Sequence, residues 1–281
     1  LTSPEREARL GVTGDYLRIA NPIAPERSVM RRSLLASVLD DLERNSRLGS
    51  SLAFFEIGPV FEPAAGELPN EHKRLALTMT GVRNTATWNA ADAAVFDFFD
   101  MKGRVEAFLH GLRLDYISFA PAEDVPYLHP GKSARVSING QPAGIMGELH
   151  PLTHARYALG QAAVLVADFD LELLRGIQAS YQLSAVPDVP PILEDIAVIV
   201  DEKIPAAQVE ALIHDAGGAS VAGVRLFDLY RGDQIGAGKK SLAYNLTYQA
   251  DRTLTDAEAA AIRSRIVKRL EKDLGAVLRA G

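Results

Sequence analysis

The most regular alternation of apolar and polar positions lies in the last third of the chain. Ile196, Val198 and Val200 share one face of an extended segment, and positions 242 to 248 alternate in the same way, so both segments are predicted to be half-buried strands. The expected elements are strands at 195–201, 221–230, 241–249 and 276–279, a helix at 205–216 behind a first-turn proline, and a helix behind the capping box at 255–258. This order is typical of a ferredoxin-like βαββαβ unit, which packs both helices on one face of its sheet.

The preceding part of the chain mixes helical and extended patterns without a regular alternation. The expected elements are a helix from near Ser28 to just before Gly49, a strand over 52–58 ended by Gly58 and Pro59, strands at 74–80 and 134–139, and a helix over 97–112. Such a mixture indicates an α+β fold with an antiparallel sheet.

A cluster of prolines divides the chain. Pro187, Pro190 and Pro191 stand within five residues, which predicts a stiff, extended connector. We therefore predict two domains, 1–185 and 186–281. A length of 281 residues is also typical of two domains.

Composition and charge exclude several classes of protein. Apolar residues make up 47% and charged residues 23%, which excludes a disordered chain. With no cysteine, the chain has no disulfide framework, no thiol nucleophile and no Cys-ligated zinc, and it suits a reducing compartment, so the cytoplasm is its predicted location. No apolar run reaches the roughly 18 residues of a membrane helix, so no membrane partner is expected. A net charge of -6 argues against an extended basic surface, so any nucleic-acid contact is expected to be local or supported by a partner chain, and no DNA partner is predicted.

Two segments resemble phosphate-binding loops but lack a required residue. The segment 129–133 ends like such a loop, but Pro126 stands where a glycine is needed. In the segment 236–241, Lys240 replaces the Ser or Thr that would reach magnesium. We interpret these as turn glycines with surface lysines.

Histidine and aspartate clusters give no catalytic or metal site. His150 and His154 have i,i+4 spacing, but a proline replaces the glutamate of a zinc protease and no third ligand is evident, which favours two loop histidines. Asp92, Asp97 and Asp100 suggest a metal, yet the last two favour the first turn of the 97–112 helix. We therefore predict no catalytic residue and no metal ligand in this chain.

The uncovered face of the predicted ferredoxin-like sheet carries polar side chains. Strand parity directs Ala197, Asp228, Tyr230, Ser241, Ala243 and Asn245 outward and directs Arg225, Phe227 and Leu229 inward. An exposed aromatic ring, a carboxylate, a hydroxyl and small neighbours can hold one flat polar ring, as in proteins that bind unpaired RNA bases. An ordinary polar sheet surface fits the pattern equally well.

Basic residues gather on the polar side of the last predicted helix. The simpler interpretation of this cluster, which spans Arg263 to Lys272, is a solvated helix face. The alternative is contact with RNA phosphates, for which the candidates are Lys239, Lys240, Arg265 and Lys268.

Motifs along nearly the whole chain, in order, resemble one family. They include Asn21-Pro22-Ile23, Met30-Arg31-Arg32-Ser33, Phe55-Glu56-Ile57-Gly58, Leu128-His129-Pro130-Gly131-Lys132-Ser133-Ala134, Gly147-Glu148-Leu149-His150-Pro151, Asp195-Ile196-Ala197-Val198, Leu226-Phe227-Asp228-Leu229-Tyr230-Arg231-Gly232, Lys240-Ser241-Leu242-Ala243 and Arg252-Thr253-Leu254-Thr255-Asp256-Ala257-Glu258. The set resembles the β subunit of bacterial phenylalanyl-tRNA synthetase, with a class II synthetase-like core over 1–185 and a ferredoxin-fold anticodon-binding domain over 186–281. That subunit also has upstream RNA-binding, editing and magnesium-associated regions that are not recognisable here. The chain, which begins at Leu1 rather than Met, is therefore expected to be a C-terminal fragment.

The resemblance implies an (αβ)₂ heterotetramer that joins phenylalanine to tRNA(Phe), using ATP and Mg²⁺, with no cofactor held by this fragment. The α subunit carries the active site, and the β core is a non-catalytic scaffold that is expected to pair with it through the helix 28–47 and the strand 52–57. The residues agree with a silent core, because Phe54 stands where a class II enzyme has a phosphate-gripping Arg. We also find no Gly-rich third motif ending in Arg between Gly147 and Arg175.

The resemblance also assigns contacts to the first (wobble) base of the anticodon. It implies that Tyr230 stacks on this base and that Asp228, Ser241 and the backbone of Ala197 form hydrogen bonds with it. Glu194 replaces an Arg that the family usually has, which argues against a phosphate contact there. Two other functions are weighed: a free-standing RNA-binding or scaffold protein derived from the synthetase, and an independent metal or nucleotide enzyme.

Overall fold

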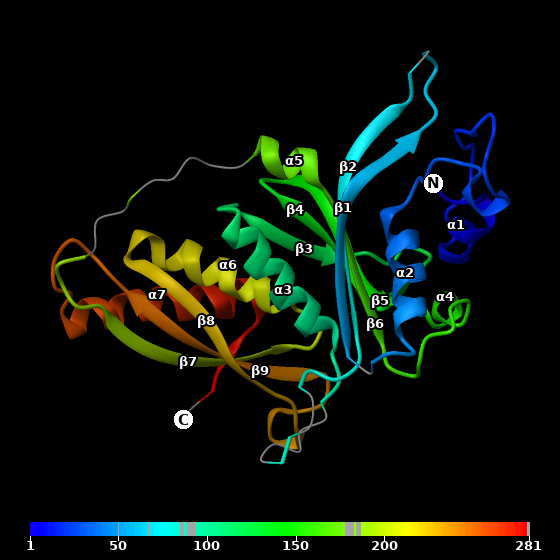
Figure 1. Cartoon of the computed structure of the whole chain (residues 1–281). Helices are drawn as coiled ribbons and strands as arrows, with labels where there is room; N and C mark the ends of the chain where they lie inside the picture. The colour runs from blue at the N-terminus through cyan, green and yellow to red at the C-terminus, as the bar shows by residue number, and fades with distance from the viewer. Residues whose placement is uncertain are drawn as a thin grey trace. The chain divides into compact units, whose positions relative to one another are not determined.

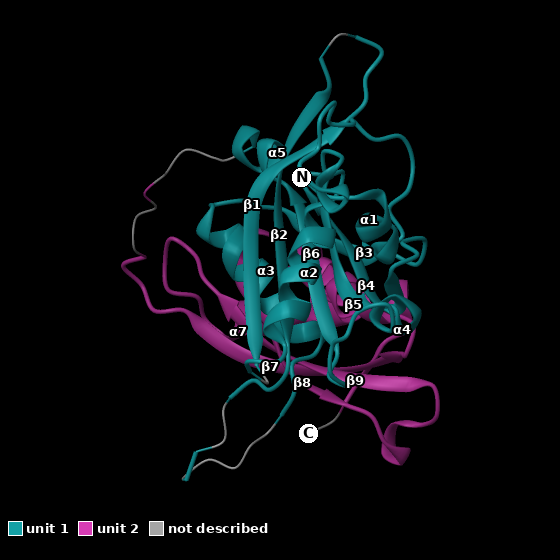
Figure 2. Ribbon diagram, turned by 45° about the vertical axis from the view of Figure 1, so that its right-hand side comes forward, with its two compact units in different colours: residues 1–182 teal, residues 183–281 magenta. Residues whose placement is uncertain are grey.

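The chain forms two compact units, Leu1–Gln182 and Leu183–Gly281 (Figure 2). This computed structural model describes residues 1–49, 51–66, 68–84, 87–88, 94–177, 183 and 187–279. The predicted boundary between residues 185 and 186 lies outside the described residues and stays a prediction.

An antiparallel six-stranded sheet organises unit 1 (Figure 1). Its strands follow the order β1-β2-β6-β5-β4-β3 and span β1 Leu52–Glu62, β2 Asn70–Thr80, β3 Ile117–Pro121, β4 Leu128–Ile138, β5 Gln141–Leu149 and β6 Val164–Asp170. The helices are α1 Pro4–Leu10, the 3₁₀ turn η1 Pro25–Arg27, α2 Leu34–Asn45, α3 Phe98–Gly111, α4 Pro151–His154 and α5 Leu171–Gly176. The predicted α+β class with an antiparallel sheet is confirmed.

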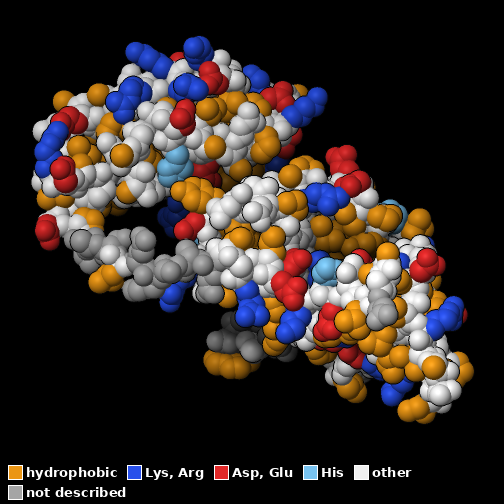
Figure 3. Space-filling view, turned by 90° about the horizontal axis from the view of Figure 1, so that it is seen from above, with side chains coloured by type: hydrophobic (Ala, Val, Ile, Leu, Met, Phe, Trp, Pro, Cys, Tyr) orange, Lys and Arg blue, Asp and Glu red, His pale blue; other side chains and the backbone are white. Residues whose placement is uncertain are grey.

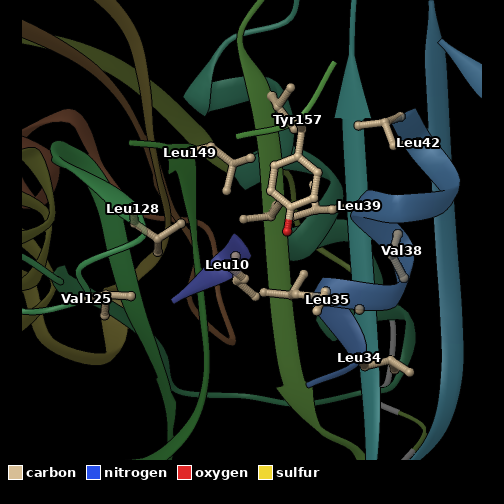
Figure 4. Close-up of a cluster of buried hydrophobic side chains, with 14 of the residues drawn as sticks. Leu10, Leu34, Leu35, Val38, Leu39, Leu42, Val125, Leu128, Leu149 and Tyr157 are labelled. Carbon is tan, nitrogen blue, oxygen red and sulfur yellow. The ribbon is translucent and has the colours of Figure 1, made fainter. Parts of the chain in front are cut away.

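The two faces of this sheet carry separate apolar cores. On one face, the buried residues of α2 pack with Leu10, Leu149 and Tyr157, and Figure 4 shows these side chains converging between α2 and the strands. On the other face, Met101, Val105 and Leu109 of α3 pack against β2, β4, β5 and β6. The sheet of unit 1 is therefore covered by helices on both sides.

The helix predicted from Ser28 begins later, at Leu34. Ser33 is the N-cap, and its Oγ accepts the backbone N–H of Ala36 at 3.3 Å. Val29 is extended instead, because it forms bridges with Thr2 and Arg18. The predicted start was wrong because pairing with the N-terminal segment outweighs local helix propensity.

The first strand does not end at Gly58 and Pro59 as predicted but continues to Glu62. β1 is an edge strand, and the N–H of Phe61 donates to the Arg31 carbonyl on the side away from β2 (2.9 Å). Pro59, two residues earlier, directs its ring nitrogen the same way, so its missing N–H removes no hydrogen bond between the strands.

Two local structures in unit 1, the start of α3 and the turn between β4 and β5, follow general rules of sequence preference. The first turn of α3 has the expected aspartates, with Asp97 as N-cap and Asp100 completing a capping box. Asn139 and Gly140 join β4 to β5 with φ values of 50° and 75°, the two left-handed positions of a type I′ hairpin turn.

Unit 2 is a four-stranded antiparallel sheet in the order β10-β7-β9-β8 with two helices. Its elements are β7 Ile192–Asp201, α6 Ala206–Gly217, η2 Gly218–Ser220, β8 Val221–Tyr230, η3 Asp233–Ile235, β9 Lys239–Tyr248, α7 Asp256–Leu274 and β10 Val277–Leu278. The predicted βαββαβ order is confirmed, as is the capping box of Thr255 and Glu258 at the start of α7. Within the described part of the chain, no helix is long and apolar enough to cross a membrane.

Candidate nucleic-acid interface

The sheet of unit 2 has one face covered by helices and one without them. Alternate side chains of β7 and β9 pack in a core with Val209 and Ile213 of α6 and Ile262, Ile266 and Leu270 of α7. Both helices therefore lie on one side of the sheet, as Figure 1 also shows. Residues of the opposite parity lie on the other face, here called the open face.

A β-bulge in β8 sets which of its side chains reach the open face. Leu226 lies opposite Tyr244, but the next paired residue is Asp228, opposite Ala243, so Phe227 is an extra residue. A bulge of this kind shifts the alternation of the strand by one position. Phe227 was predicted to point inward, but as the extra residue of the bulge it has no place in the regular alternation, and it is 51% exposed.

The shift also changes the assignment of Arg225. This residue was predicted to point inward, but it lies opposite Asn245 and so shares the open face with it. Leu229 lies opposite the buried Leu242 on the helix side, as predicted, although it is partly exposed near the edge of the sheet. Alternation alone could not locate the bulge, because an apolar Leu-Phe pair fits a continuous strand equally well.

Beyond the bulge, the structure brings the four predicted base-contact residues together in two adjacent rows across the strands. Asp228, Ala243 and Ala197 form one row, and Tyr230, Ser241 and Ile199 form the next. Ala243 and Ala197 in the first row have short side chains that rise little above the sheet. Asp228 is exposed and Tyr230 is half-buried, whereas Ser241 in the second row is buried.

The Tyr230 ring has two close neighbours besides Ser241. A Cβ atom added at Gly232 would lie 2.7 Å from Tyr230 Cζ, so the ring packs where only glycine leaves space. The Arg279 guanidinium carbon lies 5.1 Å from the ring centroid, and the Arg279 backbone N–H donates to Ala197 O at 2.8 Å. The sequence pattern did not identify Arg279 as a residue of this site, although its position at the end of the last strand could have indicated it.

A third row continues the open face on the other side of Asp228. Arg225, Asn245 and Asp195 lie opposite one another on β8, β9 and β7. Asn245 Nδ2 donates a 2.8 Å hydrogen bond to Asp195 Oδ1. The open face therefore carries the cationic groups of Arg225, Arg279 and Lys239 and the carboxylates of Asp195, Asp201 and Asp228, so its charges are balanced.

The four candidate phosphate contacts are not gathered at Tyr230. Lys239 is exposed at the start of β9, whereas Lys240 is buried and its Nζ donates to Glu202 O at 2.8 Å, which corrects its interpretation as a surface lysine. Arg265 donates to the carbonyls of Ala216 and Gly217 at the end of α6. Because α7 packs on the covered side, its Arg265 and Lys268 lie across the sheet from the open face.

Glu194 also belongs to the covered side. It lies opposite Leu246, accepts a hydrogen bond from Tyr248 Oη at 3.0 Å and pairs with Arg263 at 3.4 Å. Burial, followed by the bond to Glu194, raises the pKa of Tyr248. The negative charge of Glu194 is therefore directed at the helices and away from the open face.

The discarded motifs have ordinary structural roles. Residues 129–132 bulge out of β4, where His129 Nδ1 accepts the Gly131 N–H at 3.1 Å and Lys132 pairs with Glu148 at 2.7 Å. His150 and His154 are not loop residues, because they cap and end the short helix α4. Asp92 lies outside the described residues, and the part of the chain that is described contains no group of three metal-binding side chains.

Phe54 and Glu56 of β1 do not supply the positive charge that a nucleotide site requires. Phe54 packs against the apolar core on the α2 side of the sheet. Its neighbour Glu56 is held by Arg31 at 2.5 Å. Triphosphate chemistry needs positioned positive charge at the reacting atoms, and these residues do not fit an ATP–magnesium site.

An apolar groove lies on the opposite side of β1. Phe55 and Ile57 are 70% and 56% exposed, and they line a hollow of about 410 Å³ with Phe108 of α3 and Leu112, which directly follows that helix. The apolar side chains of α2, by contrast, are buried in their own core. The predicted assembly surface consisted of the helix 28–47 and the strand 52–57. The strand exposes apolar side chains, whereas the apolar side chains of the helix are buried.

Charges of both signs are mixed on the face seen in Figure 3. In the view of Figure 3, Lys and Arg side chains alternate with Asp and Glu and form no continuous basic band. This agrees with the net charge of -6. A nucleic acid would therefore be held by specific side chains more than by a general attraction to phosphate.

Comparison with known proteins identifies relatives of both units. Residues 1–171 match the family described as phenylalanyl tRNA synthetase beta chain CLM domain, and residues 187–279 match the ferredoxin-fold anticodon binding domain. The phenylalanine–tRNA ligase beta subunits of Halalkalibacterium halodurans and Geobacillus kaustophilus are 39% and 36% identical over 99% of this chain. That of Symbiobacterium thermophilum is 39% identical over 94% of it. The chain spans 30–35% of the length of these relatives.

Proposed function

This chain belongs to the phenylalanyl-tRNA synthetase β-chain family, and we propose that it serves a phenylalanine–tRNA ligase as anticodon reader and non-catalytic scaffold. The anticodon-reading role rests on one observation: Tyr230, Asp228, Ser241 and Ala197 lie in adjacent rows on the open face of unit 2. The place of action is the cytoplasm.

The open face suits the first anticodon base, with Tyr230 as stacking platform. A guanine offers a ring N–H and an amino group on its Watson–Crick edge, and the Asp228 carboxylate can accept both. Ala197 and Ala243 leave room for the base above the sheet. Stacking contributes about 1–3 kcal/mol per base, or roughly tenfold to a hundredfold in affinity.

Substitution of Tyr230 tests this assignment. Tyr230→Ala in the assembled enzyme should weaken tRNA(Phe) binding and reduce discrimination at the first anticodon base. The salt dependence should stay unchanged, since no phosphate contact is lost. Arg265→Ala and Lys268→Ala are controls on the covered side. Unchanged discrimination in Tyr230→Ala, with uniform weakening in the two controls, would show that the α7 side binds RNA instead.

The core of unit 1 is proposed to be a scaffold without catalysis. ATP and Mg²⁺ belong to the assembled enzyme, and Phe54 offers no charge to hold them here. The pure chain should show no phenylalanine-dependent ATP–pyrophosphate exchange. Exchange above background in the absence of α subunit would contradict this proposal.

The partner of the scaffold is proposed to be the α subunit, in an (αβ)₂ assembly. The groove beside β1 is the surface that supports this, because large stable interfaces bury apolar side chains. Phe55→Ser should reduce co-purification with α subunit while leaving the folded chain intact, because the side chain is mostly exposed. Ser37→Ala on α2 is a matched control. Equal recovery of the α subunit with Phe55→Ser and the wild type would exclude this groove.

A further inference from the structure

Arg279 stands at one end of a row that crosses the whole sheet of unit 2. The two residues of β10 pair with β7, and the Arg279 backbone N–H continues this pairing by donating to Ala197 O at 2.8 Å. Arg279 therefore joins the row of Ala197, Ala243 and Asp228, at the opposite end from Asp228. The two ends of the row lie three strand spacings apart, which is about 14 Å between Cα atoms.

The Arg279 guanidinium is held by an aromatic ring and not by a carboxylate. Its central carbon lies 5.1 Å from the centroid of the Tyr230 ring, and among the described residues Arg279 takes part in no ion pair. Lys239, another cation of the open face, lies directly opposite Asp201. A cation–π contact at an exposed site is weak, so it orders the guanidinium without preventing its transfer to a stronger partner.

We propose that Arg279 is a phosphate contact of the open face, and that RNA binding transfers its guanidinium from the Tyr230 ring to a backbone phosphate. A base that stacks on Tyr230 competes with the guanidinium for the π face of the ring. The displaced guanidinium is a planar fork of N–H donors that matches two phosphate oxygens at once. The inference rests on the proposed anticodon function of the Tyr230 row, but it concerns the RNA backbone and not the identity of any base.

The distribution of charge along the row favours a phosphate at the Arg279 end. A carboxylate repels a phosphate group, so the Asp228 end suits the edge of a base and not the backbone. Ala197 and Ala243 separate the two ends with short side chains, so a nucleotide can lie across them. The phosphate contacts expected from the sequence do not serve here, because Lys240 is buried and the α7 candidates lie on the covered side.

The test measures the affinity of the assembled enzyme for tRNA(Phe) over a series of KCl concentrations. The logarithm of the association constant falls linearly with the logarithm of the salt concentration, by about 0.7 for each phosphate contact with a single strand. Arg279→Ala should bind roughly tenfold more weakly and should lower this slope by about 0.7. The loss should be the same for tRNAs that differ at the first anticodon base. Arg279→Lys keeps the charge, so it should keep the slope.

Arg269→Ala is the matched control, because it removes an equal charge from α7 on the covered side, where Arg269 pairs with Asp215 and Asp273. It should leave the slope unchanged, and far-UV circular dichroism should show that each variant is folded. An equal fall of the slope in Arg269→Ala would show that only net charge matters and would refute the contact. If Arg279→Ala keeps the wild-type slope while Tyr230→Ala weakens binding, the phosphate contact is refuted and the anticodon face is retained. If Tyr230→Ala also binds like the wild type, the proposed anticodon face itself is refuted.

Discussion

Gly232 should control the orientation of the Tyr230 ring, and Gly232→Ala tests this. The added Cβ would lie 2.7 Å from Tyr230 Cζ and 3.2 Å from Cε1, well inside van der Waals contact. The backbone φ of Gly232 is 174°, an extended value that alanine adopts without strain. The ring must therefore turn away, while the backbone keeps its path.

The expected loss follows from the stacking interaction. If turning the ring abolishes stacking on the first anticodon base, Gly232→Ala loses about 1–3 kcal/mol of RNA binding, or roughly tenfold to a hundredfold in affinity. The free energy of unfolding should change by less than about 1 kcal/mol, since the ring lies at the surface. Gly232→Ala should therefore weaken RNA binding while changing the stability of the fold only slightly.

A double-mutant cycle with stem-loop RNA is the assay. In the Tyr230→Ala background the ring is already absent, so Gly232→Ala should have no further effect on affinity. Gly103→Ala is a suitable control, because an added Cβ there meets no atom within 4 Å. Additive losses in the double mutant would refute the view that Gly232 acts through Tyr230.

The remaining predictions concern stability. Gly144→Ala should lower the free energy of unfolding by about 1–3 kcal/mol, because the added Cβ would lie 2.5 Å from Asp168 O. Gly103→Ala in α3 should raise the free energy of unfolding by about 0.5–1 kcal/mol. Urea unfolding measures both changes. Arg9→Ala should cost about 2 kcal/mol by the same assay, because it removes ion pairs to α2 at 2.8 and 3.1 Å. The bond to Arg252 and the capping box lower the pKa of Glu258 to about 2. The contribution of Glu258 to the free energy of unfolding is therefore complete above about pH 4.5 and is lost as the pH falls toward 2. NMR titration of the Glu258 carboxyl carbon would contradict this if the midpoint stays near 4.5.

Local periodicity predicted β7 and β9 of unit 2 well because these two strands carry strictly alternating side chains. Ile196 and Val198 on β7, and Leu242 and Tyr244 on β9, are all buried as the pattern requires. Such a pattern reports which face is covered without any knowledge of the partner strands. The same rule located the rows at Asp228 and Tyr230.

The errors arose where distant segments decide local structure. β1 passes through Pro59 because it is an edge strand, and edge position is a property of the whole sheet. The start of α2 moved from Ser28 to Ser33 because Val29 pairs with the N-terminal segment. Arg279 contacts the Tyr230 ring across two intervening strands, a relation that sequence spacing does not contain.

The bulge at Phe227 also affects how the protein meets copies of itself. β8 is an edge strand, and a regular edge presents a row of unpaired backbone groups on which another chain can add a strand. The extra residue breaks the regular spacing of those groups and increases the local twist, so a flat strand cannot align along the edge. The irregularity that brings Arg225 to the open face thus also guards the β8 edge of this sheet against edge-to-edge aggregation.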